Sequence, residues 1–440
     1  MSFLCFFLLK KGARINSIQL QDIFAPEMAQ EFHTFTLPNG IRVIHKEVPR
    51  AASHVALVVN AGTRDEVKGE AGVAHFIEHC LFKGTKKRKT FHILNRLERV
   101  GGDLNAYTTK EETWISASFL ERDLGRAIEL VSDIVFNSTF PEKEIIKERD
   151  VILDEIASVL DNPSDVIFDE FEERLFGTHS LGRTILGTTD SVRSLGVDEI
   201  KNFVNRNYCT ESMVFASVGS TPIKKFKKLC EKYLNHETGK VNAIQRVAPS
   251  PQAVFDERTE QDTHQVHHLL GGMTVGADHP DKLPLTLIAN YLGGPAMNCR
   301  LSLNIREKYG MAYHIEAGYS PYQDSGVFSV YFGTDRRHHN KVESLVNKEL
   351  QLLCDNRLGV MQLHDAKKQL IGQIALSQDS GPAMMTGLAK SFLLYNRVQP
   401  LADFFKSIEQ ISSEDILRVS NQYISPEKLS RLVYLDKMTS

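Results

Sequence analysis

The chain has 440 residues, 42% hydrophobic and 24% charged, so it is long enough to form two or more domains with substantial cores. Its formal net charge of -3 gives no reason to expect a nucleic-acid partner, and no apolar run approaches the roughly eighteen residues of a membrane span. The six cysteines form no Cys-x-x-Cys pair and are typical of reduced thiols. We therefore expect a cytoplasmic protein, or one of the mitochondrial matrix if the source is eukaryotic.

The N-terminal segment, residues 1–27, is a poor secretory signal, because its apolar run is short and no small-residue cleavage site follows it. From Met28 onward, MAQEFHTFTLPNGIRVIHKEV predicts two strands joined by a Pro-Asn-Gly turn. We therefore expect residues 1–27 to be a disordered or wrongly assigned extension before the first domain.

The segment AHFIEHCLFKGT, residues 74–85, predicts a helix with His75, Glu78 and His79 on one face. Two imidazoles four residues apart can chelate one Zn²⁺, and a carboxylate beside the second can take a proton from metal-bound water. The order His-x-x-Glu-His is that of the inverzincins. The alternative is a helix with two ordinary histidines. Cys80 lies about 100° from His79 around the helix, so we expect it to pack in the core.

A second predicted helix, PEKEIIKERDVILDEIASVL from Pro141, can supply the third protein ligand that a catalytic zinc site needs. Proline suits the first helical turn, and the acids that follow it suit the positive end of the helix dipole. Glu148 and Glu155 are seven residues apart and share one face, so either could be the ligand.

The chain repeats its own plan. A strand at 53–63, the metal helix and LNAYTTKEETWISASFL are matched later by HQVHHLLGGMTVG, LPLTLIANYLGG and GMAYHIEAGYSPYQDSGVFSVYFG. A polar stretch with two prolines separates the copies and is typical of a linker. The predicted division is a catalytic domain at 28–236, a linker at 237–252 and a second domain at 253–440.

Strand blocks followed by helix blocks predict an α+β fold with two similar halves, each a mostly antiparallel sheet covered by helices on one side. The helix of the second half that corresponds to the metal helix, residues 281–294, contains no His and no Glu, so only the first half can hold the metal. Gly293 and Gly294 at its end fit either a helix C-cap or a substrate-contacting loop.

Three runs, GVAHFIEHCLFKGT, GGDLNAYTTKEET and LSLNIREKYGMAY, together with the position of Glu155, resemble the M16 family of metallopeptidases. This family includes mitochondrial processing peptidase and insulin-degrading enzyme, and the resemblance covers nearly the whole chain from Glu31. It implies the family's metallohydrolase fold. It also implies zinc ligands at His75, His79 and Glu155, with Glu148 as a carboxylate that contacts a ligand and not the metal.

The resemblance further implies that Glu78 is the general base of a zinc-dependent endopeptidase that cleaves unfolded peptides in a clamshell chamber. Arg306 and Tyr313 would stabilise the oxyanion, although residues of these types are ordinarily an exposed arginine and a half-buried strand tyrosine. An edge strand at Asn105 and Ala106 would bind the peptide backbone, and Gly293 and Gly294 would contact substrate.

Because this chain has only two domains, we expect a homodimer in which Arg306 and Tyr313 of the partner subunit complete each zinc site. The chief alternative is a non-catalytic scaffold or partner subunit of the same family. A zinc-storage module is disfavoured, because Glu78 would be a needless unliganded charge in such a site.

Overall fold

The computed structural model describes residues 32–236 and 245–437. The predicted N-terminal extension lies outside the described residues, as does the first part of the predicted linker. The hairpin expected near the start is present, because β1 (Phe32–Thr36) and β2 (Arg42–Glu47) pair in antiparallel fashion. Gly40 in its turn has a φ of 92°, a left-handed conformation that glycine adopts without strain.

The first half contains a six-stranded sheet of order β1-β2-β6-β3-β5-β4. Its other strands are β3 (Ala52–Val59), β4 (Asp103–Thr108), β5 (Thr113–Leu120) and β6 (Met213–Gly219). All neighbouring strands are antiparallel except β2 and β6. Strand β4 therefore lies at one edge of the sheet.

The second half contains a five-stranded sheet of order β7-β11-β8-β10-β9. Its strands are β7 (Asp256–Gln261), β8 (Val266–Thr274), β9 (His314–Pro321), β10 (Gly326–Thr334) and β11 (Ser430–Asp436). Only β7 and β11 are parallel neighbours. The two mostly antiparallel sheets confirm the predicted α+β class with similar halves.

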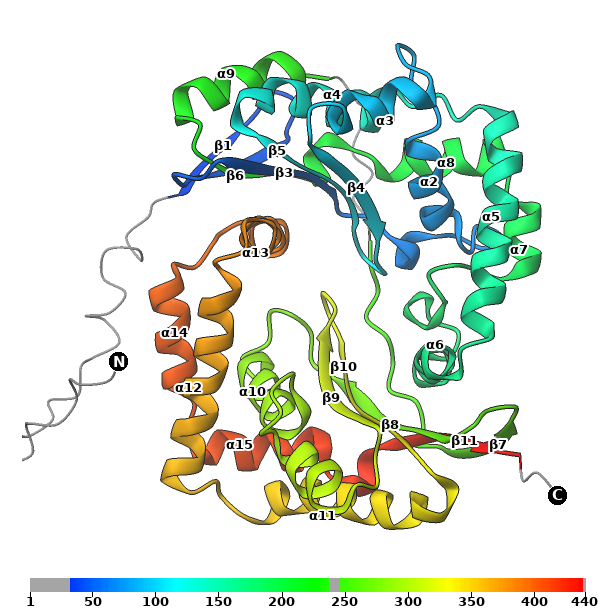
Figure 1. Cartoon of the computed structure of the whole chain (residues 1–440), viewed down its shortest axis with the longest axis vertical. Coiled ribbons are helices and arrows are strands. Elements are labelled where there is room, and N and C mark those ends of the chain that lie inside the picture. Colours follow the sequence, from blue (N-terminus) through cyan, green and yellow to red (C-terminus); the bar gives the residue numbers. More distant parts are fainter. Residues whose placement is uncertain (1–31, 237–244, 438–440) are drawn as a thin grey trace, which may run out of the picture.

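Helices fill the intervals between the strands (Figure 1). Those of the first half are α2 (Val73–Leu81), α3 (Thr90–Glu98), α4 (Leu124–Asn137), α5 (Glu142–Leu160), α6 (Pro163–Phe176), α7 (Thr189–Ser194), α8 (Val197–Asn207) and α9 (Ile223–Tyr233). Those of the second half are α10 (Lys282–Gly293), α11 (His339–Asp355), α12 (Val360–Ser377), α13 (Gly381–Tyr395), α14 (Leu401–Glu409) and α15 (Ser413–Val419).

The two halves exchange a helix. Helix α13 of the second half packs on β3 and β6 of the first, where Met384, Leu388 and Phe392 join one buried cluster with Val58 and Val214. In return, α6 of the first half packs on β8 and β11 of the second, and the two exchanged helices lie on opposite sides of the molecule in Figure 1. The expectation that helices cover one side of each sheet was therefore wrong. Each sheet has its own helices on one face and a helix of the other half on the second face.

The predicted linker is held firmly where the structure describes it. Arg246 forms an ion pair of 2.8 Å with Asp65, and both side chains are almost fully buried. The same guanidinium donates to the side-chain oxygens of Asn60 and Gln323, one from each half.

The exact domain boundaries remain a prediction. Among the described residues, no helix has the length and apolar character needed to cross a membrane.

Candidate metal centre

Helix α2 packs its apolar face in the core and carries its polar side chains on the remaining face. It begins after Gly72, whose φ of 87° is left-handed, and its apolar side chains fill the core of the first half. Cys80 belongs to that core, as predicted, and is 1% exposed. The remaining face carries His75, Glu78 and His79, and α2 packs against α5.

Three potential metal-binding atoms converge between these helices. The Nε2 atoms of His75 and His79 lie 3.7 and 3.5 Å from Oε2 of Glu155. One ligand atom from each residue lies within 4.8 Å of the others. Tetrahedral Zn²⁺ with bonds near 2.1 Å would place its ligand atoms about 3.4 Å apart, close to these separations. Two imidazoles and a carboxylate also form a donor set that suits zinc, so the residues fit the predicted ion.

Glu148 occupies a different position from Glu155 on the same helix. Its Oε2 lies 3.3 Å from Nδ1 of His79, and its Oε1 lies 2.6 Å from Nζ of Lys83. With Nδ1 protonated, His79 donates to Glu148 and keeps the lone pair of Nε2 for a metal. The spacing of the two acids left the choice between them open, and the family resemblance implied Glu155. The geometry brings Glu155 to both Nε2 atoms. The contact of Lys83 with Glu148 was not predicted.

The protonation states favour metal binding. Burial, together with the neighbouring ring of His79, lowers the pKa of His75 to about 4, so its imidazole is neutral near pH 7 and able to act as a ligand. Burial raises the pKa of Glu78, although hydrogen bonds from the side chain and backbone of Thr108 oppose the shift. A raised pKa makes Glu78 a stronger base than an ordinary glutamate.

Arg306 and Tyr313 lie in the second half. Arg306 is on a π-helical turn, Ser302–Glu307, and its Nε donates to Glu307 at 3.0 Å. Tyr313 precedes β9, is 66% exposed, and donates its hydroxyl to Asp335 at 3.0 Å. The alternative of a half-buried strand tyrosine therefore does not describe Tyr313, and its role as an oxyanion donor remains a prediction. Within one chain these two residues have polar partners in their own half.

The predicted substrate-binding residues fall in two places. Asn105 and Ala106 lie in the interior of β4, the edge strand of the first sheet. Gly293 is the last residue of α10, and Gly294 caps the helix by donating to the Asn290 carbonyl at 3.1 Å. A Cβ at Gly293 would come within 2.3 Å of the Ala317 nitrogen, so close packing of α10 on β9 explains this glycine. The geometry favours the C-cap reading of the pair.

A second group of potential ligands, His268, His339 and Glu343, lies in the second half. The two buried imidazoles contact each other, with Nδ1 of His268 2.9 Å from Nε2 of His339. Glu343 is already paired with Arg258 and Arg431, at 3.4 and 3.6 Å. Two guanidinium groups beside the Glu343 carboxylate oppose a divalent cation there.

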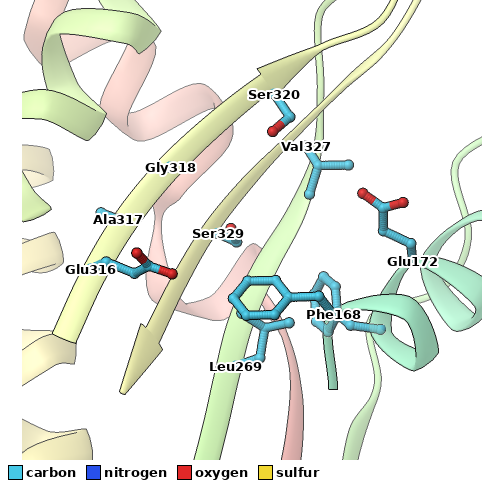
Figure 2. Close-up of a pocket in the computed structure, with 10 residues that line it drawn as sticks. Phe168, Glu172, Leu269, Glu316, Ala317, Gly318, Ser320, Val327 and Ser329 are labelled. Atoms are coloured by element: carbon cyan, nitrogen blue, oxygen red, sulfur yellow. The ribbon is translucent and has the colours of Figure 1, made fainter. Parts of the chain in front are cut away.

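A cavity of about 230 Å³ lies where α6 meets the second sheet. Figure 2 shows Phe168 and Glu172 of α6 on one side and Glu316, Gly318 and Ser320 of β9 on the other. None of the three candidate metal ligands lines it. The cavity therefore belongs to the contact between the two halves.

Comparison with known proteins agrees with the fold. The profile for Insulinase (Peptidase family M16) matches residues 42–189, and that for the Peptidase M16 inactive domain matches residues 194–370. An uncharacterized zinc protease of Mycobacterium leprae is 32% identical over 399 residues, which cover 89% of this chain and 88% of that protein. The chain belongs to peptidase family M16.

Other similar proteins cover the chain to a similar extent. The uncharacterized zinc protease YmxG of Bacillus subtilis is 28% identical over 91% of this chain and 97% of its own length. A protease from Helicobacter pylori has the same fold, with a TM-score of 0.87, 22% identity, and coverage of 92% of this chain and 100% of that chain. A Pseudomonas fluorescens structure described as a peptidase M16 inactive domain gives a TM-score of 0.86 at 21% identity, covering 93% of this chain and 98% of its own.

Proposed function

We propose that this M16 protein is a zinc-dependent endopeptidase that hydrolyses unfolded peptides. The observation that carries the proposal is the convergence of His75, His79 and Glu155, whose candidate ligand atoms lie within 4.8 Å of one another. Glu78 lies on the same helix as the two histidines, between them and next to His79. A site for metal storage alone would have no use for this fourth polar group.

The residues around the metal would divide the work. A Zn²⁺ ion held by His75, His79 and Glu155 would supply a Lewis acid and lower the pKa of water. Glu78 would take the proton of the attacking water and pass it to the departing amine. Glu148 would keep the His79 ring in the orientation that directs Nε2 toward Glu155, because it accepts from Nδ1.

The peptide would bind along β4. An edge strand has unpaired backbone groups, and a substrate strand can add to it through main-chain hydrogen bonds with little dependence on its sequence. Thr108, the last residue of β4, contacts the Glu78 carboxylate through its side chain and backbone. A peptide paired with Asn105 and Ala106 would therefore run past the proposed base. Only an extended, unfolded segment can pair in this way.

Arg306 and Tyr313 would act in a homodimer. The Tyr313 side chain is exposed and the Arg306 side chain is 33% exposed, so both could reach the zinc site of a second copy. There the guanidinium and the phenol would donate to the oxyanion of the tetrahedral intermediate. Two copies would form a closed chamber that admits peptides and excludes folded proteins.

A non-catalytic partner subunit is the second candidate, since the profile matching residues 194–370 is that of an inactive domain. The two candidates differ in one assay. Purified protein should cleave a quenched, unstructured peptide, a chelator should abolish the cleavage, and one equivalent of Zn²⁺ should restore it. Absence of cleavage by fully zinc-loaded protein would favour the partner-subunit role.

A further inference from the structure

Glu66 is a buried carboxylate that contacts the start of the metal helix. It lies six residues before Gly72 and is 4% exposed. Its Oε2 accepts the backbone N–H of Gly72 at 3.1 Å, and its Oε1 accepts that of Ala74 at 3.0 Å. Ala74 directly precedes His75, so the carboxylate is hydrogen-bonded to the backbone next to the first candidate zinc ligand.

Helix α2 needs an acceptor at this end that its own sequence does not provide. The first N–H groups of a helix have no partner within the helix and are usually capped by a side chain at the N-cap position. Here the N-cap residue is Gly72, and α2 has no side-chain cap from this position. Glu66 satisfies two amides at the beginning of the helix from outside it.

A capping side chain at position 72 is sterically excluded. A Cβ there would approach the Leu186 carbonyl oxygen to 2.7 Å, and the φ of +87° disfavours any side chain. Gly187 on the facing segment is equally restricted, because its Cβ would come within 2.7 Å of the Ala71 oxygen. The close approach of the two backbones therefore requires glycine at the N-cap and leaves the capping role to a more distant residue.

The position of Glu66 is itself fixed by both halves of the molecule. Nη1 of Arg183 donates to its backbone oxygen at 2.7 Å. Two residues earlier, the buried Arg64 pairs with Glu111 at 2.6 Å and with Asp324 of the second half at 2.7 Å. The carboxylate therefore presents a rigid acceptor to α2.

We propose that Glu66 is a positioning residue for the zinc site, an inference that rests on the proposed function. His75, Glu78 and His79 all lie on the nine-residue helix α2. A shift of its first turn would move both imidazoles relative to Glu155, which is held on α5. Glu66 fixes that turn and thereby sets the distance between the two parts of the ligand set.

The test compares Glu66→Ala and Glu66→Gln with a matched control, Glu70→Gln. Glu70 lies in the same loop and is also buried, but its carboxylate accepts from Val67 N–H at 3.1 Å and pairs with Arg206 at 2.5 Å, without contacting the amides of α2. Zinc affinity is measured by competition with a chromophoric chelator, independently of peptidase activity. Thermal unfolding of each zinc-free variant gives its loss of stability.

We expect Glu66→Ala to weaken zinc affinity by on the order of 10-fold or more, by comparison with groups that orient metal ligands. Glu66→Gln keeps one acceptor oxygen and should give a smaller loss in the same direction; it also serves if the alanine variant does not fold. Glu70→Gln should lose stability yet keep the wild-type affinity. Equal affinities in wild type and both Glu66 variants would overturn this proposal alone. A wild-type protein that binds no zinc would overturn it together with the proposed function.

Discussion

His79 and Glu148 are joined through Nδ1 and Oε2 at 3.3 Å, on the side of the ring opposite the nitrogen that faces Glu155. Glu148 and Glu155, both on α5, therefore lie next to the two different nitrogens of the His79 ring. Because Nε2 of His79 lies 3.5 Å from Glu155 and that acid also faces His75, the two carboxylates cannot have the same role.

Replacing Glu155 by Gln should remove most bound zinc, since a charged ligand becomes a weak neutral one. Replacing Glu148 by Gln should weaken zinc affinity by about 10-fold to 100-fold while leaving stoichiometric binding at saturating metal. Metal analysis after dialysis distinguishes the two variants. Full zinc content in Glu155→Gln would remove that residue from the ligand set.

Mixing two inactive variants tests the proposed shared site. Glu78→Gln lacks the base and Arg306→Ala lacks the oxyanion donor, so each homodimer should be inactive. In a mixed dimer, one site has an intact Glu78 and receives Arg306 of the partner subunit. After equal mixing and complete exchange, about a quarter of wild-type activity should return.

Subunit exchange must be verified in that experiment, for example by native mass spectrometry of the mixed dimer. If Arg306 acts on the site of its own chain, every site in the mixed dimer lacks one group. Exchange without recovery of activity would therefore reject the shared site and leave the peptidase assignment in place.

The pH dependence of the protein's stability should show the titration of the Glu66 carboxyl group. Burial raises its pKa from 4.5 to about 8, although the two helix amides oppose the shift. The folded state therefore binds this proton more tightly than the unfolded chain, and the associated stability is present below about pH 4.5 and is lost as the pH rises through about 8. The Glu66→Gln side chain cannot titrate. As the pH rises through this range, the melting temperature of the wild type should therefore fall relative to that of the variant. Parallel curves would contradict the assigned shift.

Packing of the exchanged helix α13 on the first sheet should stabilise the folded protein. Phe392 is 7% exposed and packs in the cluster on the first sheet, so Phe392→Ala should cost about 3–5 kcal/mol of the free energy of unfolding. Leu376→Ala, at a side chain that is 72% exposed on α12, should change it by less than about 0.5 kcal/mol. Denaturant unfolding followed by the fluorescence of Trp114, which lies in the same cluster, measures both.

Much of the local structure could be predicted from the sequence, because the hydrophobic period and the spacing of polar residues are properties of short segments. The helix with His75 and His79, the helix with Glu148 and Glu155, and the duplicated plan were all readable. Spacing alone left the roles of the two acids open, because residues seven apart share a face, and only the family resemblance assigned Glu155 as the ligand. The cap from Glu66 and the exchange of α6 and α13 depend on contacts between distant segments, for which the sequence carries no periodic signal.

The most direct test of the proposed peptidase is Glu78→Gln, measured for zinc content and peptide cleavage in the same preparation. The amide keeps the shape of the side chain but cannot accept a proton. The variant should bind one equivalent of zinc like the wild type and lose at least about 10²-fold to 10⁴-fold in kcat on a quenched, unstructured peptide. A zinc-loaded variant with near-wild-type turnover would show that Glu78 is not the base and would contradict the account of this site.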